Sequence, residues 1–254
     1  MGLPATPSFR LDGRRALVTG AGRGIGLAAA SALAQAGATV TLVARNIVEV
    51  RAAAAEIVAA GGRAEALVLD VTDVASVAAA CAAAAPFDIL VNSAGTNRPK
   101  PFVTVTPDDF DTVMTLNLRA AFFVAQAVAR RMIDAGVKGT IINISSQMGH
   151  VGGENRTIYC ASKHALEGLS KAMAVELGPH GIRVNTLCPT FIETPMTRPY
   201  FENLAFRSSV LSKIKLGRVC QVEDVMGAIV FMASDAAAMM TGSAVIVDAG
   251  WTAD

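Results

Sequence analysis

The chain has 254 residues and a formal net charge of +1, with 52% hydrophobic and 17% charged residues. This length suits one large α/β domain, and the low charged fraction excludes an extensively disordered chain. The balanced charge gives no electrostatic reason to expect binding to nucleic acid or to an anionic membrane. Any ligand must therefore be recognised by a local site.

The N-terminal segment and the cysteines are typical of a cytoplasmic protein. The first twelve residues hold two prolines and no apolar signal-peptide core. No stretch has the roughly 20 uninterrupted apolar residues of a membrane span. Cys81, Cys160, Cys188 and Cys220 are far apart in the sequence and lack zinc-ligand spacing. We therefore expect free thiols, buried or partly buried, and no metal.

The first half of the chain alternates short apolar runs with alanine-rich helical runs, and glycines or prolines separate them. The predicted elements are a strand over Arg15–Thr19, a helix over Gly24–Ala36, a strand over Thr39–Ala44, a helix over Ile47–Ala60, a strand over Ala66–Leu69, a helix over Asp73–Ala84 and a strand over Phe87–Val91. The strands are nearly continuous apolar runs, as a parallel sheet buried on both faces requires.

In the second half, a long helix begins at Pro107, where Thr106 is a cap, and continues through Asn117 to about Ala135. The next predicted elements are a strand over Thr140–Ile144, a helix over Ile158–Leu177, a strand over Ile182–Leu187, a helix over Val222–Ala233 and a strand over Ser243–Val247. The stretch Pro189–Leu216 is less regular, and we interpret it as a substrate lid over about residues 190–216.

Seven strands alternating with helices predict an α/β fold of the doubly wound, Rossmann type. Its sheet is parallel and seven-stranded, with helices on both faces and right-handed crossovers. The sequence shows no linker, repeat or low-complexity segment. We therefore expect residues 1–254 to form one domain that both binds a dinucleotide and carries out the catalysis.

A glycine cluster joins the first strand to the first helix. Gly20, Gly24 and Gly26 are spaced G-x-x-x-G-x-G, with Arg23 and Ile25 between them. Glycine permits a tight turn and close approach of the backbone to a pyrophosphate, which the helix N-terminus attracts. Glycines alone also mark ordinary turns. The preceding strand and the following helix make this cluster a predicted dinucleotide site.

The end of the second strand indicates which cofactor is used. A site for NAD(H) usually places an acid there to bind the ribose hydroxyls, whereas this strand ends in Ala44 and is followed by Arg45 and Asn46. Arg23 and Arg45 supply two guanidinium groups for a 2′-phosphate, which favours NADP(H). Alternatively, Arg45 is a solvated residue at the start of the next helix, and NAD(H) is used.

Further cofactor contacts are expected where the strands end, because ligands of open α/β sheets lie at the carboxyl ends of the strands. Asp70 can accept a hydrogen bond from the adenine amino group, and it can also cap the following helix. The candidates at these ends are Asp70, Val71, Asn92, Ala94, Gly95 and Pro189.

Tyr159 and Lys163 are four residues apart on a predicted helix and so share one face. A free tyrosine has a pKa of about 10, and a nearby ammonium together with an oxidised nicotinamide lowers it. Ser146 ends the fifth strand and can bind a substrate oxygen as charge develops there. A Tyr-x-x-x-Lys pair alone is usually a surface pair, but together with the glycine loop it predicts a catalytic site.

Taken together, these motifs resemble the short-chain dehydrogenase/reductase family over essentially the whole chain. The matching segments are Thr19-Gly-Ala-Gly-Arg-Gly-Ile-Gly26, Asn92-Ser-Ala-Gly95, Asn117, Ser146, Tyr159-Cys-Ala-Ser-Lys163 and Pro189. The resemblance implies that Tyr159 is the general acid/base, that Ser146 orients the carbonyl, and that Lys163 binds the ribose and tunes Tyr159.

The resemblance also implies that Asn117 holds a water linking Lys163 to solvent. Thr194, in the segment that begins at Ile192, would bond the nicotinamide carboxamide. Two positions depart from the family pattern, because Ser93 replaces an asparagine and Thr190 replaces a glycine. Ser93 can still donate and accept hydrogen bonds, whereas Thr190 changes the pocket beside the nicotinamide.

Substrate contacts are expected from residues 96–101, from the polar stretch 147–156 and from the lid. Gln147 and His150 are candidate substrate ligands beside Ser146 and Tyr159. This density of polar groups favours a small polyhydroxylated or acidic substrate. Alternatively, the stretch is a solvated loop.

The sequence thus predicts an NAD(P)-dependent oxidoreductase acting on a carbonyl or secondary alcohol of a small sugar, polyol, or hydroxy or keto acid. An alternative is a 3-oxoacyl-[acyl-carrier-protein] reductase, for which basic residues near the mouth are available at Lys100, Arg207, Lys213 and Lys215. A non-catalytic dinucleotide sensor would not need the Tyr-Lys pair. Apolar surface on the helices bearing Asn117 and Tyr159 predicts a homo-oligomer, either a dimer or a tetramer.

Overall fold

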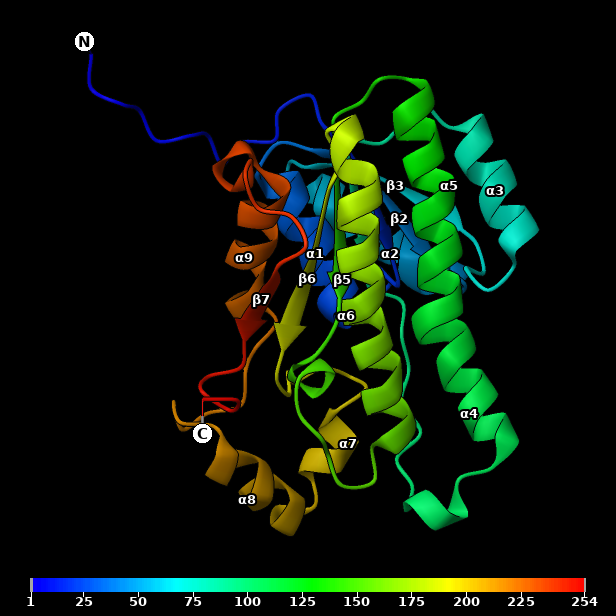
Figure 1. Ribbon diagram of the computed structural model, residues 1–254, viewed down its shortest axis with the longest axis vertical. Coiled ribbons are helices and arrows are strands. Elements are labelled where there is room, and N and C mark those ends of the chain that lie inside the picture. The colour runs from blue at the N-terminus through cyan, green and yellow to red at the C-terminus, as the bar shows by residue number, and fades with distance from the viewer. Residues whose placement is uncertain (1, 254) are drawn as a thin grey trace.

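The computed structural model describes residues 2–253 and confirms the doubly wound fold (Figure 1). Within those residues, one parallel sheet has the strand order β3-β2-β1-β4-β5-β6-β7. The strands are β1 (Arg15–Thr19), β2 (Thr39–Ala44), β3 (Arg63–Val68), β4 (Ile89–Asn92), β5 (Thr140–Ile144), β6 (Arg183–Pro189) and β7 (Ala244–Val247). The order reverses between β1 and β4, which creates the crevice where ligands of such sheets bind.

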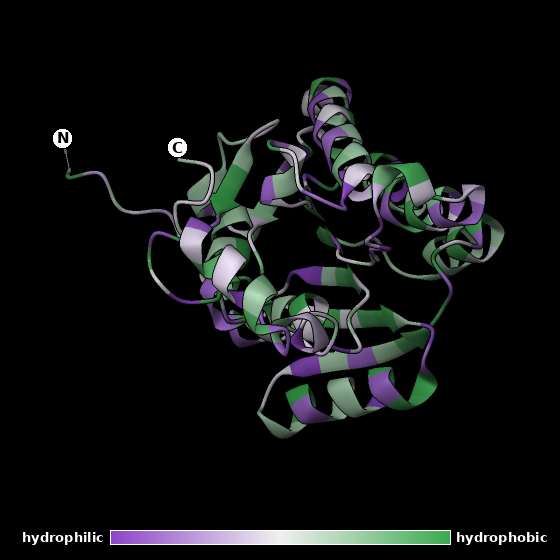
Figure 2. Cartoon of the chain, turned by 90° about the horizontal axis from the view of Figure 1, so that it is seen from below, coloured by the Kyte–Doolittle hydropathy of each residue, from purple (hydrophilic) through white to green (hydrophobic). Residues whose placement is uncertain are grey.

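Helices cover both faces of the sheet. One face carries α1 (Gly24–Gln35), α2 (Ile47–Ala59) and α9 (Glu223–Ala233), and α1 packs against α9. The other face carries α3 (Val74–Ala83), α5 (Ala121–Asp134) and α6 (Thr157–Leu177). In Figure 2 the strands are largely green, whereas the helices carry both colours, as expected for a sheet enclosed by amphipathic helices.

The sheet separates two apolar clusters. Ile89 and Val91 of β4 belong to the cluster under α1 and α9, and Leu90 between them belongs to the cluster under α5. All three side chains are essentially inaccessible to solvent. Alternation with a period of two therefore buries both faces of one strand, which explains why the central strands are continuous apolar runs.

The long helix predicted from Pro107 has a π-helical middle. Helix α4 (Pro107–Met114) begins with a capping box between Thr106 and Asp109, and a π-helical stretch, η2 (Thr115–Ala120), joins it to α5. By length and hydropathy this continuous helix, 107–134, could cross a membrane. Here one apolar face of the helix, which includes Val124 and Met132, is buried against the sheet, whereas Phe110 and Phe122 are exposed.

The edge strand β3 begins three residues earlier than the sequence predicts. It covers Arg63–Val68, and its exposed residues alternate with partly buried ones. The prediction relied on a continuous apolar run, which occurs only where both faces of a strand are covered. At the sheet edge, charged residues such as Arg63 and Glu65 occupy strand positions, so the apolar run begins after the strand has started.

The segment 190–216, predicted from the sequence to be a substrate lid, contains two helices that the sequence did not predict. Strand β6 continues to Pro189, and α7 (Arg198–Phe201) and α8 (Leu204–Lys213) follow it. In Figure 1 both helices lie beyond the carboxyl ends of β5 to β7. Phe191 packs against Phe206 and Trp251, with ring centroids 5.6 Å apart in each pair. This aromatic cluster joins the segment 190–216 to the C-terminal segment.

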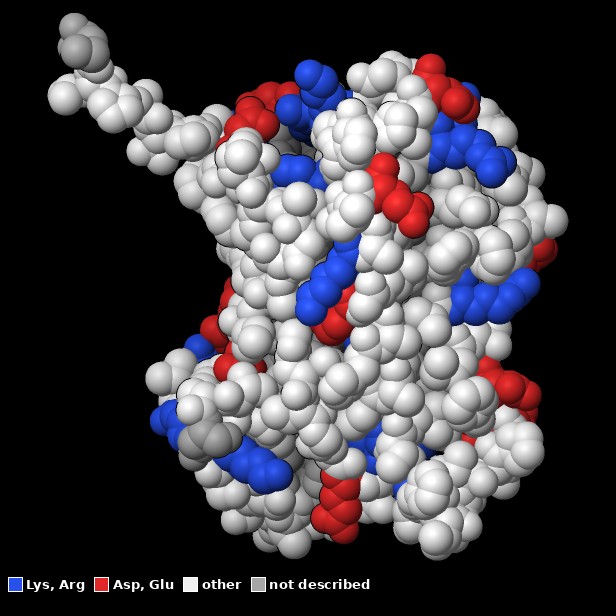
Figure 3. Space-filling model, in the orientation of Figure 1, with Lys and Arg blue, Asp and Glu red and all other residues white. Residues whose placement is uncertain are grey.

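Short 3-10 turns complete the described chain, and charges are dispersed over its surface. The turns are η1 (Phe102–Thr104), η3 (Gln147–Gly149), η4 (Gly178–His180) and η5 (Asp235–Ala237). Figure 3 shows basic and acidic side chains interspersed on the face in view, without a patch of one sign.

Candidate active site

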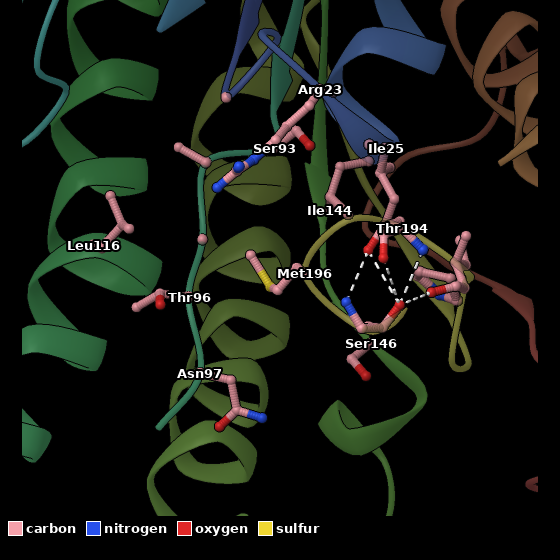
Figure 4. A pocket seen from close by; sticks show the side chains of 18 of the residues that line it. Arg23, Ile25, Ser93, Thr96, Asn97, Leu116, Ile144, Ser146, Thr194 and Met196 are labelled. Atoms are coloured by element: carbon pink, nitrogen blue, oxygen red, sulfur yellow. Dashed lines mark hydrogen bonds between the residues drawn. The ribbon is translucent and has the colours of Figure 1, made fainter. Parts of the chain in front are cut away.

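A cavity of about 750 Å³ lies at the carboxyl ends of the strands and extends from the glycine loop to the lid. In Figure 4, Arg23 lies at one end of the labelled side chains and Asn97 at the other, with Ser146, Thr194 and Met196 between them. The predicted site residues that line this cavity are Gly20, Arg23, Gly24, Ile25, Gly26, Arg45, Asn46, Val71, Ala94, Gly95, Ser146, Gln147, Tyr159, Lys163, Pro189, Ile192 and Thr194.

The glycine loop is closely packed. Gly20 has a φ of +67°, and a Cβ there would lie 2.9 Å from the backbone of Ala94. A Cβ on Gly26 would lie 2.3 Å from the carbonyl oxygen of Gly20. No side chain caps α1. The uncapped N–H groups of its first turn can therefore bind an anion, as the glycine spacing predicted.

The end of the cavity where the adenosine is expected holds one acid as well as two arginines, and a second acid lies beside it. Arg23 lies 3.5 Å from Glu49, which also lines the cavity, and Arg45 lies 3.8 Å from Asp70. The prediction of NADP(H) assumed that no carboxylate competes with a 2′-phosphate for Arg23 and Arg45. These two ion pairs show that this assumption is wrong. The sequence analysis looked for an acid only at the end of β2, whereas Glu49 comes from the first turn of α2.

Two predicted cofactor ligands do not line the cavity. Asn92 is buried and donates hydrogen bonds to Asn143 Oδ1 (3.0 Å) and to the carbonyl of Ala121 (3.2 Å), so its side chain ties β4 to β5 and α5. Asp70 accepts hydrogen bonds from the backbone N–H and the hydroxyl of Thr72. The N-cap of α3 is Asp73, not Asp70.

Asn117 is buried in the π-helical stretch behind the cavity. Its side-chain amide donates to the carbonyl of Thr96 (2.9 Å) and to Ser162 Oγ (3.1 Å), and its Oδ1 accepts from the N–H of Thr96 (2.8 Å). These bonds fix the loop after β4, which supplies Thr96 and Asn97 to the cavity wall. π-helical turns are frequent at functional sites because they reorient backbone and side-chain groups.

His150 does not line the cavity, although the sequence analysis placed it at the substrate. Its Nε2 lies 3.4 Å from Cys188 Sγ and 3.8 Å from Glu167. The Cys188 thiol donates to Glu167 (3.3 Å), and Thr186 donates to the same carboxylate (2.8 Å). Burial raises the pKa of Cys188 to about 12. These contacts hold the imidazole against β6 and α6.

Lys163 is buried directly beside Tyr159. Its Nζ donates to the carbonyl of Ile144 (2.8 Å) and lies 5.5 Å from the centre of the Tyr159 ring. Burial lowers the pKa of Lys163 to about 8, because the charged form loses hydration.

The phenol of Tyr159 responds to burial in the opposite direction. Burial raises the pKa of Tyr159, while a hydrogen bond with Ser146 and the charge of Arg156 act against that rise. The sequence analysis expected a lowered pKa, but it counted the charge of an oxidised nicotinamide as well as that of the lysine. Because Tyr159 is buried, the protein by itself favours the neutral form of the phenol.

Ser146 is oriented by the short turn that follows β5. Its Oγ accepts from the N–H of Met148 (3.1 Å) and donates to Gln147 Oε1 (2.6 Å). The hydroxyl therefore has a defined donor direction, and a substrate oxygen in the cavity can replace Gln147 as its acceptor.

Two further side chains line the cavity: Thr197, which the sequence did not indicate, and Arg156, which belongs to the polar stretch 147–156 expected to contact the substrate. Thr197 anchors Thr194, whose N–H donates to Thr197 Oγ1 (3.0 Å), while Thr197 Oγ1 donates to the carbonyl of Ile192. Arg156 is buried beside Tyr159, although it belongs to a polar stretch that could equally have been a solvated loop. Only the folded structure, in which the Tyr200 ring lies 5.9 Å from the guanidinium carbon of Arg156, distinguishes these possibilities.

Comparison with known proteins agrees with this geometry. The family model described as enoyl-(acyl carrier protein) reductase matches residues 20–252. The chain is 42% identical to D-erythrulose reductase of Gallus gallus, over 96% of this chain and 98% of that protein. The chain is a short-chain dehydrogenase/reductase.

Further relatives of this short-chain dehydrogenase/reductase have the same overall architecture or act on small polar molecules. D-threitol dehydrogenase of Mycolicibacterium smegmatis is 43% identical over 96% of this chain and 95% of that protein. The structure of a gluconate 5-dehydrogenase from Burkholderia cenocepacia, in complex with NADP and tartrate, superposes with a TM-score of 0.94 at 40% identity. The superposition covers 99% of this chain and 100% of the gluconate 5-dehydrogenase chain. The protein is therefore an oxidoreductase of this family.

Proposed function

We propose that this protein is an NADP(H)-dependent oxidoreductase that interconverts a carbonyl and a secondary alcohol of a small polyhydroxylated substrate. One observation carries the proposal: a single cavity joins the glycine loop to Ser146, Tyr159 and Lys163. The names of the relatives support the substrate class, because they describe enzymes acting on erythrulose, threitol and gluconate.

In the proposed reaction the nicotinamide, when bound, supplies or accepts the hydride. Ser146 donates a hydrogen bond to the substrate oxygen, and Tyr159 protonates that oxygen during reduction or removes its proton during oxidation. Lys163 binds ribose hydroxyls and, as a nearby cation, stabilises the phenolate when it forms. The hydrogen bond of Lys163 to Ile144 keeps its ammonium 5.5 Å from the centre of the Tyr159 ring.

We assign Asn117 to the proton path behind Lys163. Its side chain is already engaged with Thr96 and Ser162, so a water there would have to bind a backbone group of the π-helical turn. A turn of this kind leaves carbonyl groups outside the regular i to i−4 pattern. In this arrangement the proton leaves Tyr159 by way of Lys163.

The choice of NADP(H) follows from the cavity and from the neighbours. Arg23 and Arg45 line the adenosine end, where each can contact a 2′-phosphate once it moves away from its carboxylate partner. The gluconate 5-dehydrogenase structure contains NADP. NAD(H) remains the alternative that a comparison of the two cofactors tests.

Carrier-bound acyl chains are a less suitable substrate. Lys100, one of the basic residues considered for carrier binding, is paired with Asp109, and Lys213 lies over the ring of Trp251. Their positive charges therefore have partners on this chain. A non-catalytic sensor is also disfavoured, because the relatives named above are enzymes.

We further propose a cytoplasmic homo-oligomer in which residues 1–254 form one domain and residues 190–216 are the substrate lid. The sequence predicted an interface from the apolar residues on the helices that bear Asn117 and Tyr159. Several of these residues are instead buried within the chain: Ala120, Ala121, Ala125 and Leu166. Phe122 on α5 and Phe110 on α4 stay exposed, together with Val175 on α6. An interface along α4, α5 and α6 would cover these three side chains.

The proposed function is tested with purified protein and a panel of sugars, polyols, sugar acids and acyl thioesters, read by cofactor absorbance with NADP(H) and with NAD(H). We expect turnover of polyhydroxylated compounds and at least a tenfold preference in kcat/KM for NADP(H). Turnover confined to acyl thioesters, or a tenfold preference for NAD(H), would contradict the corresponding part of the proposal.

A further inference from the structure

Arg156 is a buried cation without an acidic partner. The residue is 7% exposed, and none of the ion pairs among residues 2–253 includes it. Its one hydrogen bond as a side-chain donor in the described chain runs from Nη1 to the carbonyl of Asn155, at 3.3 Å. A guanidinium offers five N–H donors, so most of its capacity is unused.

The surroundings of Arg156 give it little electrostatic compensation. The Tyr200 ring lies 5.9 Å from the guanidinium carbon, and burial lowers the pKa of the arginine. Buried charges in proteins are normally paired, because an unpaired charge loses its hydration without compensation. A site that binds an anion explains this arrangement, since the ligand then supplies the missing charge.

The position of Arg156 directs that anion into the active-site cavity. Arg156 lines the cavity, occupies the N-cap position of α6 and precedes Tyr159 by three residues. No side chain caps α6, so the positive end of a 21-residue helix faces the same region. Among the described residues lining the cavity, the only acid is Glu49, and it pairs with Arg23 at the adenosine end.

We propose that Arg156 binds a carboxylate of the substrate, so that the enzyme acts on small hydroxy acids and keto acids of the sugar-acid type rather than on neutral sugars or polyols. The inference rests on the proposed function and narrows its substrate class. The planar fork of a guanidinium binds a carboxylate through two parallel hydrogen bonds. The carboxylate would then lie on the α6 side of the cavity, with the reacting carbon beside Tyr159 and Ser146.

A carboxylate suits this subsite better than a phosphate ester. A phosphate monoester carries close to two negative charges at neutral pH, whereas Arg156 supplies one positive charge. The other basic residue at this end, Lys163, already donates to Ile144 and is needed beside Tyr159. One guanidinium and one helix terminus match a single carboxylate.

The experiment compares two substrates that differ only at one carbon. D-Gluconate carries a carboxylate where D-glucitol carries a primary alcohol, and oxidation of each is followed with NADP. We expect kcat/KM for gluconate to exceed that for glucitol by at least about 100-fold, because a buried group left without its partner strongly disfavours the analogue. A third compound, glucose 6-phosphate, tests whether the enzyme accepts a phosphate ester of similar size in place of the carboxylate.

Variants assign the preference to the guanidinium. In Arg156→Met the gluconate value should fall at least about 30-fold more than the glucitol value, since the loss of the charge beside Tyr159 affects both substrates alike, and Arg156→Lys should recover part of the difference. Arg130→Met, which removes an exposed arginine on α5, is the matched control and should leave both values unchanged. With NADP present, gluconate should raise the Tm of the wild type but not that of Arg156→Met, which gives a readout independent of turnover.

The outcomes separate this inference from the proposed function. If kcat/KM for glucitol or for glucose 6-phosphate equals or exceeds that for gluconate, the carboxylate assignment is wrong. The oxidoreductase proposal is then unaffected. An unchanged gluconate preference in Arg156→Met also overturns it. If no sugar, polyol or sugar acid in the panel is oxidised or reduced, the proposed function itself fails.

Discussion

At the scale of single residues, burial sets the protonation of the Tyr159–Lys163 pair. In the proposed mechanism, oxidation of an alcohol needs a deprotonated Tyr159 to accept the proton, whereas reduction of a carbonyl needs the protonated phenol. Burial raises the pKa of Tyr159, so the phenolate becomes more abundant as pH rises above neutrality. Lys163, with a pKa of about 8, loses its charge over the same range and weakens its support for the phenolate.

These directions predict opposite pH responses for the two reactions. The kcat/KM for alcohol oxidation should rise from pH 6 to pH 8, by up to about tenfold per pH unit, and flatten above pH 8. The kcat/KM for carbonyl reduction should not rise over that range. Steady-state rates measured in both directions from pH 6 to pH 10 test this. A pH-independent oxidation rate would contradict the assignment of Tyr159 as the base.

The residues show where sequence reasoning succeeded and where it could not succeed. Ser146, Tyr159 and Lys163 were predicted because strand ends and helical spacing place them at one edge of the sheet. Glu49 was not recognised, and Arg156 was expected only as one member of the polar stretch 147–156, because the roles of both depend on burial and on neighbours from other elements. His150, predicted beside the substrate, does not line the cavity but contacts Glu167 and Cys188, two residues from other elements that the sequence does not place next to it.

At the scale of elements, the glycine loop is the least tolerant part of the fold. A Cβ at Gly26 would lie 2.3 Å from the carbonyl oxygen of Gly20, a backbone atom that cannot move alone. Gly26→Ala should therefore destabilise the protein by about 1–3 kcal/mol and abolish dinucleotide binding. Thermal unfolding and a cofactor-binding titration measure the two effects.

A second glycine provides the matched control. Gly227 lies inside α9, where an added Cβ meets no atom within 4 Å. Gly227→Ala should stabilise the helix by about 1 kcal/mol and raise Tm by about 2–4 °C without affecting cofactor binding. If Gly26→Ala behaved like Gly227→Ala, the close packing of the loop would be irrelevant to the site.

The elements also show how far the sequence predicts the fold. β1, β2 and β5 have the predicted bounds, because they are central apolar runs flanked by clear turns. The edge strand β3 was shifted because one of its faces is exposed. α7 and α8 escaped prediction because they are short and depend on the aromatic cluster around Phe191, which forms only in the folded chain.

At the scale of the whole molecule, four large apolar side chains of the described residues on α4, α5 and α6 remain uncovered: Phe110, Phe122, Ile133 and Val175. Phe110 and Phe122 are each nearly half exposed, and Val175 is 78% exposed. We expect a dimer or a tetramer by light scattering at micromolar concentration. Phe122→Glu should shift the mass toward the monomer, whereas a monomeric wild type would contradict the proposed assembly.

The central claim is that Tyr159 transfers the proton in a reaction whose hydride moves to or from NADP(H). Replacing its hydroxyl with hydrogen tests this most directly, because Tyr159→Phe leaves the ring and its packing in place. The account predicts that kcat falls at least about 100-fold while the Kd for NADPH, measured by fluorescence titration, changes less than threefold. Unchanged turnover with intact NADPH binding would contradict it.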